Sequence, residues 1–252
     1  PNAMGNDSLL DLFHQIGEEI EAALSDLDNW GEADGHAGQY VHDVVADSIA
    51  VPILYGAGLG IISEESEPIG LDRPLVAVVD PIDGSTNASN GVPWFSLSIC
   101  LVNSQEAVSS YVRNLATGVS YTAERGSGSE RDGRKIHASL TTHVGDSILA
   151  LNDLPPRNFG WKQYRTMGSA ALDLCSVADG TFDGYIDFSS GLAIWDYAGA
   201  AFICEEAGVT LTTSEGLSID FSSFVNDFGA RNRVVAGCTS ELHESLMKSI
   251  SV

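Results

Sequence analysis

The sequence predicts a mixed fold that is α+β in its first half and α/β in its second half. Two helical patterns are followed by a run of strand patterns, and helix and strand patterns then alternate to the end of the chain. The 252 residues are 44% hydrophobic and include 26 glycines, which is typical of a compact protein with a large core. We expect an N-terminal half of residues 4–145 and a C-terminal half of residues 146–252.

Two amphipathic helices are expected at the start of the chain. Residues 7–28 carry apolar side chains at three- and four-residue spacing, with acidic residues between them. A second helical pattern covers residues 40–54, although Pro52 is expected to kink or end it. The apolar side chains expected to face inward from this second helix are Val41, Val44, Val45 and Ile49. Asp43 and Asp47 fall four residues apart, and the simplest interpretation of such a pair is a solvated acidic face.

The stretch at residues 76–87 joins a buried strand to a polar turn. Four apolar residues lead to Asp80, and Pro81 is expected to end the strand because it has no N–H to donate. The residues that follow are typical of turns and helix N-caps: Asp83, Gly84, Ser85 and Thr86. Carboxylates beside free backbone N–H groups can hold a hard cation and an anion together, which metal-assisted phosphate chemistry requires. A strand–turn–helix junction with acidic capping residues is the structural alternative.

The remaining elements follow from alternation and from turn residues. Residues 61–66 are expected to form a short strand that runs into Glu64 and Glu65. Strands are expected at residues 94–102, 107–112, 119–123, 147–151, 184–188 and 234–237, a glycine-rich, hairpin-like loop at 125–135, and helices at 168–179 and 241–250. Asp196 is placed to N-cap one more helix, which closes at Gly208.

The charge balance limits the possible partners. With 12 lysines and arginines against 35 aspartates and glutamates, the formal charge is −23, so neither nucleic acid nor an anionic membrane is an expected partner. A phosphorylated substrate would be repelled unless metal cations stood between it and the protein. No apolar run approaches the roughly 20 residues of a membrane helix, and no basic-then-apolar signal pattern is present, so we expect a cytoplasmic protein. The four cysteines form no Cys-x-x-Cys pair and are expected to be buried, reduced thiols.

Three motifs together resemble those of the inositol monophosphatase family, which belongs to the lithium-sensitive, Mg²⁺-dependent phosphatases. The motifs are Glu64-Glu65-Ser66, Asp80-Pro81-Ile82-Asp83-Gly84-Ser85-Thr86-Asn87 and Trp195-Asp196-Tyr197-Ala198-Gly199-Ala200. They agree with the family in order and separation, and the pattern is most similar to its archaeal inositol monophosphatase/fructose-1,6-bisphosphatase branch. The resemblance implies a layered α-β-α-β-α sandwich, one family-level domain with its metal site between the two halves, and a homodimer.

The resemblance also implies roles for individual residues. Glu64, Asp80 and the Ile82 carbonyl would hold one Mg²⁺, and Asp80, Asp83 and Asp196 would hold a second, with a third, weaker ion near Glu64 in some members. Ser85, where the family usually has threonine, would pair with Asp43 to orient and deprotonate the attacking water, and Glu64 would complete the catalytic set. The residues implied to bind the phosphate and the sugar are Gly84, Ser85, Thr86, Arg165 and Asp187.

The implied reaction is hydrolysis of a small sugar or polyol phosphate by metal-activated water. Inositol-1-phosphate is the first choice of substrate, fructose 1,6-bisphosphate is the second, and histidinol phosphate and 3′-phosphoadenosine 5′-phosphate are substrates of other relatives. The archaeal branch commonly carries arginines where this chain has Ser189 and Ala193, and the loss of these cations would weaken the binding of a second phosphate. A binding paralogue without turnover is the alternative of a different class, but all the motif carboxylates are present. Inhibition by millimolar lithium is also expected.

Overall fold

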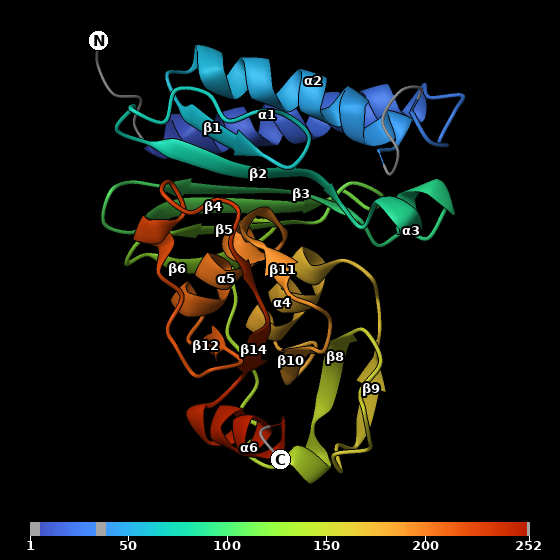
Figure 1. The fold of residues 1–252 in the computed structure, drawn as a ribbon, viewed down its shortest axis with the longest axis vertical. Helices are drawn as coiled ribbons and strands as arrows, with labels where there is room; N and C mark the ends of the chain where they lie inside the picture. Colours follow the sequence, from blue (N-terminus) through green and yellow to red (C-terminus); the bar gives the residue numbers. More distant parts are fainter. Residues whose placement is uncertain (1–5, 34–38, 251–252) are drawn as a thin grey trace.

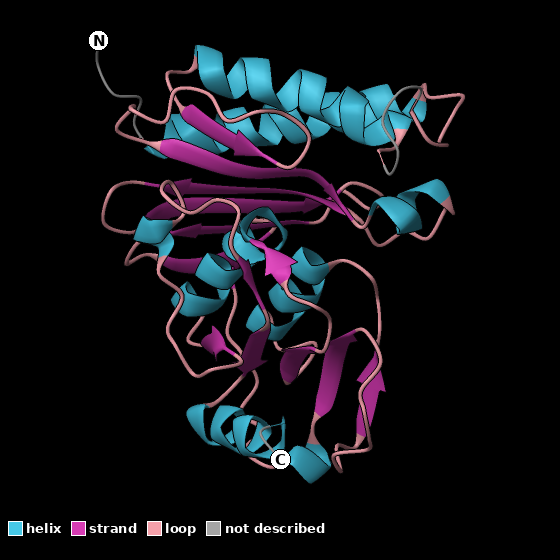
Figure 2. Cartoon of the chain, in the orientation of Figure 1, coloured by secondary structure: helices cyan, strands magenta, loops and turns pink. Residues whose placement is uncertain are grey.

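The computed structural model describes residues 6–33 and 39–250, which fold into five stacked layers (Figure 1, Figure 2). Helices α1 (Asn6–Ser25) and α2 (Val41–Gly56) form the first layer and cover one face of a large sheet. Helices α4 (Ala170–Ala178) and α5 (Ile194–Glu206) separate that sheet from a smaller one, and α6 (Ser240–Ile250) covers the far side of the smaller sheet. The expected α-β-α-β-α sandwich is therefore confirmed.

In the described part of the chain, the large sheet has seven strands in the order β1-β2-β3-β4-β5-β6-β7. Its strands are β1 (Gly60–Ser63), β2 (Val76–Asp83), β3 (Ser96–Val102), β4 (Ala107–Asn114), β5 (Ser120–Glu124), β6 (Gly128–Arg131) and β7 (Arg134–Lys135). Strands β1 and β2 are parallel, and the later neighbours pair antiparallel. The hairpin-like loop expected at residues 125–135 contains the paired strands β6 and β7, which extend this sheet.

The smaller sheet has the order β12-β14-β10-β8-β9 among the described residues. Its strands are β8 (Ile148–Asn152), β9 (Gln163–Arg165), β10 (Gly184–Asp187), β12 (Thr210–Thr213) and β14 (Val234–Gly237). A separate two-stranded pair consists of β11 (Leu192–Ala193) and β13 (Arg231–Asn232). Short helical turns lie at α3 (Ser85–Ser89), η1 (Val144–Asp146) and η2 (Phe221–Ser223). Strands β9, β11 and β13 were not expected, because pieces of two or three residues are too short to show an alternating pattern. Strand β12 was not expected because Leu211 is its one apolar residue.

Helix α2 differs from its expected orientation. It accommodates Pro52 and continues to Gly56, and the predicted inward face is wrong because Val44 is 42% exposed. The side chains that face inward are His42, Asp43, Ala46, Ala50 and Leu54. The small alanines allow α2 to pack closely on its neighbours, and this rotation turns Asp43 away from solvent, so the interpretation of Asp43 as part of a solvated face is also wrong.

Strand β2 does not end at Asp80 as expected. It continues to Asp83, and its pairing with β3 shifts register because Asp80 lies opposite Ser98 while Asp83 lies opposite Ser96. The extra residue forms a β-bulge that contains Pro81, where the missing N–H breaks no ladder bond. The bulge bends the end of β2 and delivers both carboxylates to the same edge of the sheet. A helix follows the turn, as the capping residues indicated: α3 begins at Ser85 and is five residues long.

Helix α5 also begins slightly earlier than expected. Ala193 is its N-cap, and Asp196 lies in the first turn instead of at the cap position. The Asp196 carboxylate nevertheless accepts a hydrogen bond from the Ala193 N–H at 2.8 Å. The side chain thus performs part of the capping expected of it, from three residues further along the helix.

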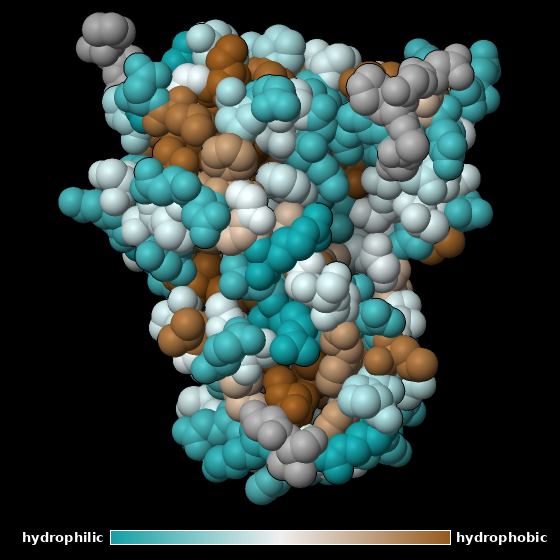
Figure 3. Space-filling model, viewed as in Figure 1, coloured by the Kyte–Doolittle hydropathy of each residue, from teal (hydrophilic) through white to brown (hydrophobic). Residues whose placement is uncertain are grey.

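The thiols and the surface agree with the composition. Cys100, Cys175, Cys204 and Cys238 are all buried and free. On the face drawn in Figure 3, hydrophilic residues cover most of the surface and hydrophobic ones lie in separate patches. None of the helices within residues 6–33 and 39–250 is both long and apolar enough to cross a membrane.

Candidate functional site

Three carboxylates from separate elements meet between the large sheet and helix α5. Glu64 follows β1, Asp80 lies on β2 at the bulge, and Asp196 is in the first turn of α5. One carboxylate oxygen from each lies within 4.8 Å of the other two. The parallel pairing of β1 with β2 brings Glu64 beside Asp80, and packing of α5 on β2 and β3 adds Asp196. Carboxylate oxygens in this arrangement could hold a hard divalent cation.

Asp83 lines a small cavity together with these three carboxylates, and it is held by the start of helix α4. Its Oδ2 accepts hydrogen bonds from the Ser169 hydroxyl at 2.6 Å and from the Ala171 N–H at 2.7 Å. Ser169 is also the N-cap of α4, so a helix N-terminus fixes the orientation of this carboxylate. The cavity measures about 190 Å³ and is also lined by Glu64, Asp80, Asp196, Ile82, Gly84 and Ser85. The sequence motifs did not indicate the contact with Ser169, although the run from Gly168 to Ala171 marked a helix start.

Asp43 and Ser85 form the hydrogen-bonded pair that the resemblance implied. The Ser85 hydroxyl donates to Asp43 Oδ1 at 2.8 Å, although the two residues are 42 positions apart. Asp43 is only 3% exposed, and its Oδ2 accepts a hydrogen bond from the Tyr40 N–H at 3.1 Å. Ser85 Oγ also lies 2.9 Å from the Ile82 carbonyl oxygen, so the hydroxyl has a second acceptor within reach. The pair lies at the edge of the carboxylate cluster, because Ser85 lines the same cavity.

The carboxyls of the cluster have raised pKa values. Removal from water is the largest cause, and the negative charges of neighbouring carboxylates add to it for Glu64, Asp80 and Asp196. The pKa of Asp83 is raised to about 6, that of Asp196 to about 7 and that of Glu64 to about 8. For Asp83, the bonds from Ser169 and the start of α4 act in the opposite direction. A group of carboxyls that resist ionisation together suits a bound cation, because its positive charge would relieve the repulsion.

These shifts predict a pH-dependent stability in the absence of metal. The folded state binds protons at Asp83, Asp196 and Glu64 more tightly than the unfolded chain does, so the free energy of unfolding should decrease as the pH rises from about 5 to about 8. Glu64 lies at the open side of the cluster, where water screens its charge, so we expect most of the change in the lower part of this range.

Thermal unfolding in EDTA and in saturating Mg²⁺ at several pH values measures this dependence. Saturating Mg²⁺ should raise Tm most at the alkaline end, since the cation then replaces protons that the carboxyls have lost. The pH dependence of the rest of the protein is common to both series and cancels in their difference. A Mg²⁺-induced rise in Tm that is the same at every pH would contradict this prediction.

Three other residues that the sequence indicated lie outside the small cavity. Asp187 on β10 is 3% exposed, and its Oδ1 accepts hydrogen bonds from Asn152 Nδ2 at 3.1 Å and from the Ser189 N–H at 2.9 Å. Thr86 is exposed on α3. Arg165 is exposed on β9, and its guanidinium donates to the Tyr164 carbonyl and to the Gln163 side chain. Asp187 is the best placed of the three, because Asn152 lines the cavity.

Arg231, which belongs to none of the sequence motifs, brings a positive charge near Asp196. It lies on β13 opposite Ala193 of β11, and its Nη1 donates to the Gly191 carbonyl at 3.2 Å. Its charge lowers the pKa of Asp196, against the larger effect of burial. The long sequence separation hid this residue, since only the β11–β13 pairing places it next to the motif.

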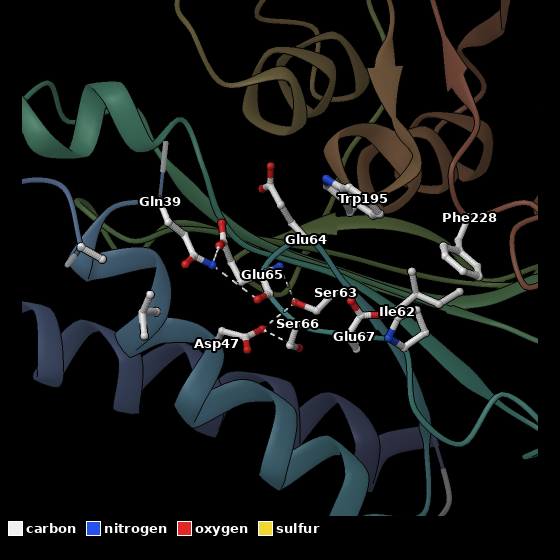
Figure 4. A pocket seen from close by; sticks show the side chains of 13 residues that line it. Gln39, Asp47, Ile62, Ser63, Glu64, Glu65, Ser66, Glu67, Trp195 and Phe228 are labelled. Carbon is white, nitrogen blue, oxygen red and sulfur yellow. Dashed lines mark hydrogen bonds between the residues drawn. The ribbon is translucent and has the colours of Figure 1, made fainter. Parts of the chain in front are cut away.

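A larger cavity of about 780 Å³ lies on the α2 side of Glu64 (Figure 4). Gln39 donates to the Glu65 carboxylate, and the Ser63 hydroxyl donates to Asp47 at 2.6 Å. Trp195 and Phe228 come from the C-terminal part of the chain and form the opposite wall. Lysine, arginine and histidine are all missing from its described lining, so this cavity would repel an anion.

Comparison with known proteins supports the family that the motifs resembled. A family model described as the inositol monophosphatase family matches residues 28–251. A fructose-1,6-bisphosphatase/inositol-1-monophosphatase of Archaeoglobus fulgidus is 38% identical over 213 residues, which cover 82% of either chain. The protein of that name from Methanothermobacter thermautotrophicus is 31% identical over 274 residues, covering 94% of this chain and 95% of the relative. The crystal structure of the extragenic suppressor protein suhB from Bartonella henselae has a TM-score of 0.80 at 28% identity, covering 96% of this chain and 98% of that one.

Proposed function

Because this chain belongs to the inositol monophosphatase family, we propose that it is a metal-dependent phosphomonoesterase that hydrolyses a small sugar or polyol phosphate. One observation carries the proposal: Glu64, Asp80 and Asp196 converge on a cavity that also contains the Ser85 hydroxyl, bonded to Asp43. A water-orienting pair beside a candidate cation site is an arrangement that suits metal-assisted hydrolysis of a phosphate ester.

The donor set fits Mg²⁺, which prefers carboxylate and carbonyl oxygens. We assign Glu64, Asp80 and the Ile82 carbonyl to one ion and Asp80, Asp83 and Asp196 to a second, with a third, weaker ion near Glu64. The bound ions would supply a lowered pKa for water and would stabilise the charge on the leaving oxygen. The contact of Ser169 and the α4 N-terminus with Asp83 would hold that ligand in place before any ion binds.

The chain's own groups then have distinct tasks. Ser85 Oγ would accept a hydrogen bond from the attacking water. As the water gives its proton to Ser85 Oγ, the Ser85 hydroxyl would pass its own proton to Asp43 across the 2.8 Å contact between the two side chains. The Gly84 and Ser85 N–H groups at the start of α3, together with Thr86, would bind phosphate oxygens. Asp187, whose second oxygen is buried without a partner among the described residues, would accept a sugar hydroxyl.

Inositol-1-phosphate is the substrate we propose first. Neither cavity at the site has a basic residue in its described lining, and a substrate with a single phosphate needs no second cation beyond the metal ions. Fructose 1,6-bisphosphate is the second candidate, since two relatives are named for both activities and Arg231 could pair with a second phosphate. Arg165 is a weaker candidate for that task, because its guanidinium is bonded to neighbouring residues of its own strand.

The proposal is tested by measuring phosphate release from four esters in parallel. These are inositol-1-phosphate, fructose 1,6-bisphosphate, histidinol phosphate and 3′-phosphoadenosine 5′-phosphate. We expect Mg²⁺-dependent turnover of inositol-1-phosphate well above that of histidinol phosphate and of 3′-phosphoadenosine 5′-phosphate. The assay should be run at low and at molar salt, because the charge of −23 repels anionic substrates most strongly at low ionic strength.

An Arg231→Gln variant separates the two sugar substrates. If Arg231 binds a second phosphate, the variant should lose activity on fructose 1,6-bisphosphate by about tenfold or more while its activity on inositol-1-phosphate changes little. An equal effect on both substrates would assign Arg231 to the structure of the β11–β13 pair instead. Absence of turnover on all four esters at either salt concentration would contradict the proposed function and favour a non-catalytic binding paralogue.

The proposal also covers the location of the protein in the cell, its oligomeric state and its inhibition by lithium. We propose a cytoplasmic homodimer that is inhibited by lithium at millimolar concentration, with a small phosphorylated molecule as its partner in place of nucleic acid or membrane. The family membership and the acidity of the chain support these assignments.

A further inference from the structure

A buried histidine beside the Asp43–Ser85 pair has no task in the site described so far. His42 lies on α2 with no exposed surface, and neither of its ring nitrogens has a hydrogen-bond partner among the described residues. Buried polar groups are almost always hydrogen-bonded, because an unpaired group loses its hydration without compensation. The imidazole of His42 therefore requires a polar neighbour that it can reach.

The carboxylate of Asp43 is one such neighbour, and the backbone of Ser85 is a second. His42 Nε2 lies 3.4 Å from Asp43 Oδ1, the same oxygen that accepts the Ser85 hydroxyl at 2.8 Å. A carboxylate oxygen has two lone pairs, so Oδ1 can accept from both donors at once. Hydrogen bonds in unliganded active sites are often long and shorten when the substrate complex forms, so a shift of a few tenths of an ångström would complete this one.

Two aromatic rings fix the imidazole in this position. Tyr40 stacks on it with ring centroids 5.1 Å apart and an angle of 21° between the planes. Trp30 packs against it at 5.3 Å and 37°, and the Trp30 Nε1–H is itself held by the Leu27 carbonyl. Because both rings constrain the plane of the imidazole, Nε2 is held within 3.4 Å of Asp43 Oδ1.

Burial also favours the uncharged form of this histidine. It lowers the pKa of His42, and this effect is larger than the opposite ones of the Asp43 charge and the Ser85 backbone. A neutral imidazole carries one N–H and can act as a donor to a carboxylate without contributing a positive charge to the site.

We infer that His42 is a positioning residue whose Nε2–H holds the Asp43 carboxylate in the orientation that accepts the Ser85 hydroxyl. The inference rests on the proposed function, since it adds His42 to the pair that orients the attacking water. Asp43 is then fixed at both oxygens, by the Tyr40 N–H at Oδ2 and by His42 at Oδ1. The Ser85 hydroxyl consequently meets an acceptor of fixed direction, and the water bonded to Ser85 is oriented with it.

Two substitutions test the N–H donor and the aromatic ring of His42 separately. His42→Phe keeps an aromatic ring between Tyr40 and Trp30 but removes the N–H, whereas His42→Gln loses the ring but places an amide N–H near the position of Nε2. The inference predicts that His42→Phe lowers kcat by about tenfold or more, with KM and Mg²⁺ affinity nearly unchanged, and that His42→Gln restores most of the loss. If His42 were only a packing residue, Phe would be the better replacement and this order would be reversed.

His243→Phe is the matched control. His243 is 6% exposed, and its Nε2 lies 3.0 Å from Thr212 Oγ1 in the C-terminal part of the chain, away from the site. This variant should lower Tm through its lost hydrogen bond while leaving kcat unchanged, which separates loss of stability from loss of catalysis. Wild-type kcat in His42→Phe, or an equal loss in the Phe and Gln variants, would overturn the inference.

A second measurement does not depend on turnover. In protein labelled with ¹⁵N-histidine, the imidazole nitrogen shifts of His42, assigned from their loss in His42→Gln, report which nitrogen carries the proton. The inference predicts a neutral ring protonated at Nε2, and a proton found at Nδ1 instead would overturn it. If no phosphate ester were hydrolysed by the wild-type protein, the proposed function would fail, and this experiment would still decide whether His42 donates to Asp43.

Discussion

Replacing Asp80 with asparagine is expected to reduce kcat/KM by about a thousandfold or more, since a bound cation supplies several kcal/mol of charge stabilisation and each 1.4 kcal/mol is tenfold. Asp80 is 1% exposed, and the Ile82 N–H donates to its Oδ1 at 3.0 Å, so the side chain is fixed in direction. It is also the residue that we assign to both metal ions. Asparagine has nearly the same shape, so the loss would come from the missing charge.

The same substitution should stabilise the protein when no metal is bound. Burial and the charges of Glu64, Asp83 and Asp196 raise the pKa of Asp80 well above its usual value, so an ionised carboxylate at this position opposes folding. Asp80→Asn removes that charge, and Tm in EDTA should therefore rise above that of the wild type at alkaline pH. Saturating Mg²⁺ should raise Tm much less in the variant than in the wild type.

Calorimetric titration of Mg²⁺, steady-state kinetics and thermal unfolding check this combination of effects. Asp72→Asn is a suitable control, because Asp72 is exposed shortly before the same strand and its replacement should leave all three quantities unchanged. An Asp80→Asn protein with wild-type kcat/KM would show that the cluster of Glu64, Asp80 and Asp196 is not the site of catalysis.

The parts of the site that the sequence predicts are the ones whose geometry is local. The spacing of Asp80, Asp83 and Ser85 along one strand and turn indicated a cation beside exposed N–H groups, and the structure keeps all three around one cavity. The bulge at Pro81 was missed, because a proline after a strand is equally consistent with the end of pairing.

Contacts between distant segments could not be predicted from spacing. The residues alone gave no reason for Asp43 to reach Ser85, since the approach depends on how α2 rotates against the sheet, and only the family resemblance suggested it. Ser169 and Arg231 were missed for the same reason, because α4 and the β11–β13 pair bring them to the site from far along the chain. His42 was hidden by the expectation that the valines of α2 would face inward.

Ser85→Ala should lower kcat by about a hundredfold, which is the lower end of what a positioned proton-transfer group contributes. Unlike Asp80→Asn, it should leave Mg²⁺ affinity nearly unchanged, because the carboxylates and the Ile82 carbonyl remain. Ser85→Thr keeps the hydroxyl and should retain most of the activity. Ser89→Ala, which removes a hydroxyl that bonds only to the Thr86 carbonyl and to Asn90 within the described part of α3 and its C-terminal cap, is the control and should have wild-type kinetics.

The expected separation of kcat from metal affinity follows from the two acceptors of the Ser85 hydroxyl. Its oxygen lies 2.8 Å from Asp43 Oδ1 and 2.9 Å from the Ile82 carbonyl oxygen, and its one proton can be donated to only one of them at a time. If the Ile82 carbonyl is engaged by a cation, as we propose, Asp43 becomes the better acceptor, and Ser85 Oγ turns its lone pairs to the attacking water. Metal binding would then set the direction of the hydroxyl, although the hydroxyl contributes little to metal binding. If Ser85→Ala kept its kcat, the proposed link between the metal site and Asp43 would be wrong. If it lost Mg²⁺ affinity instead, Ser85 would be part of the metal site itself.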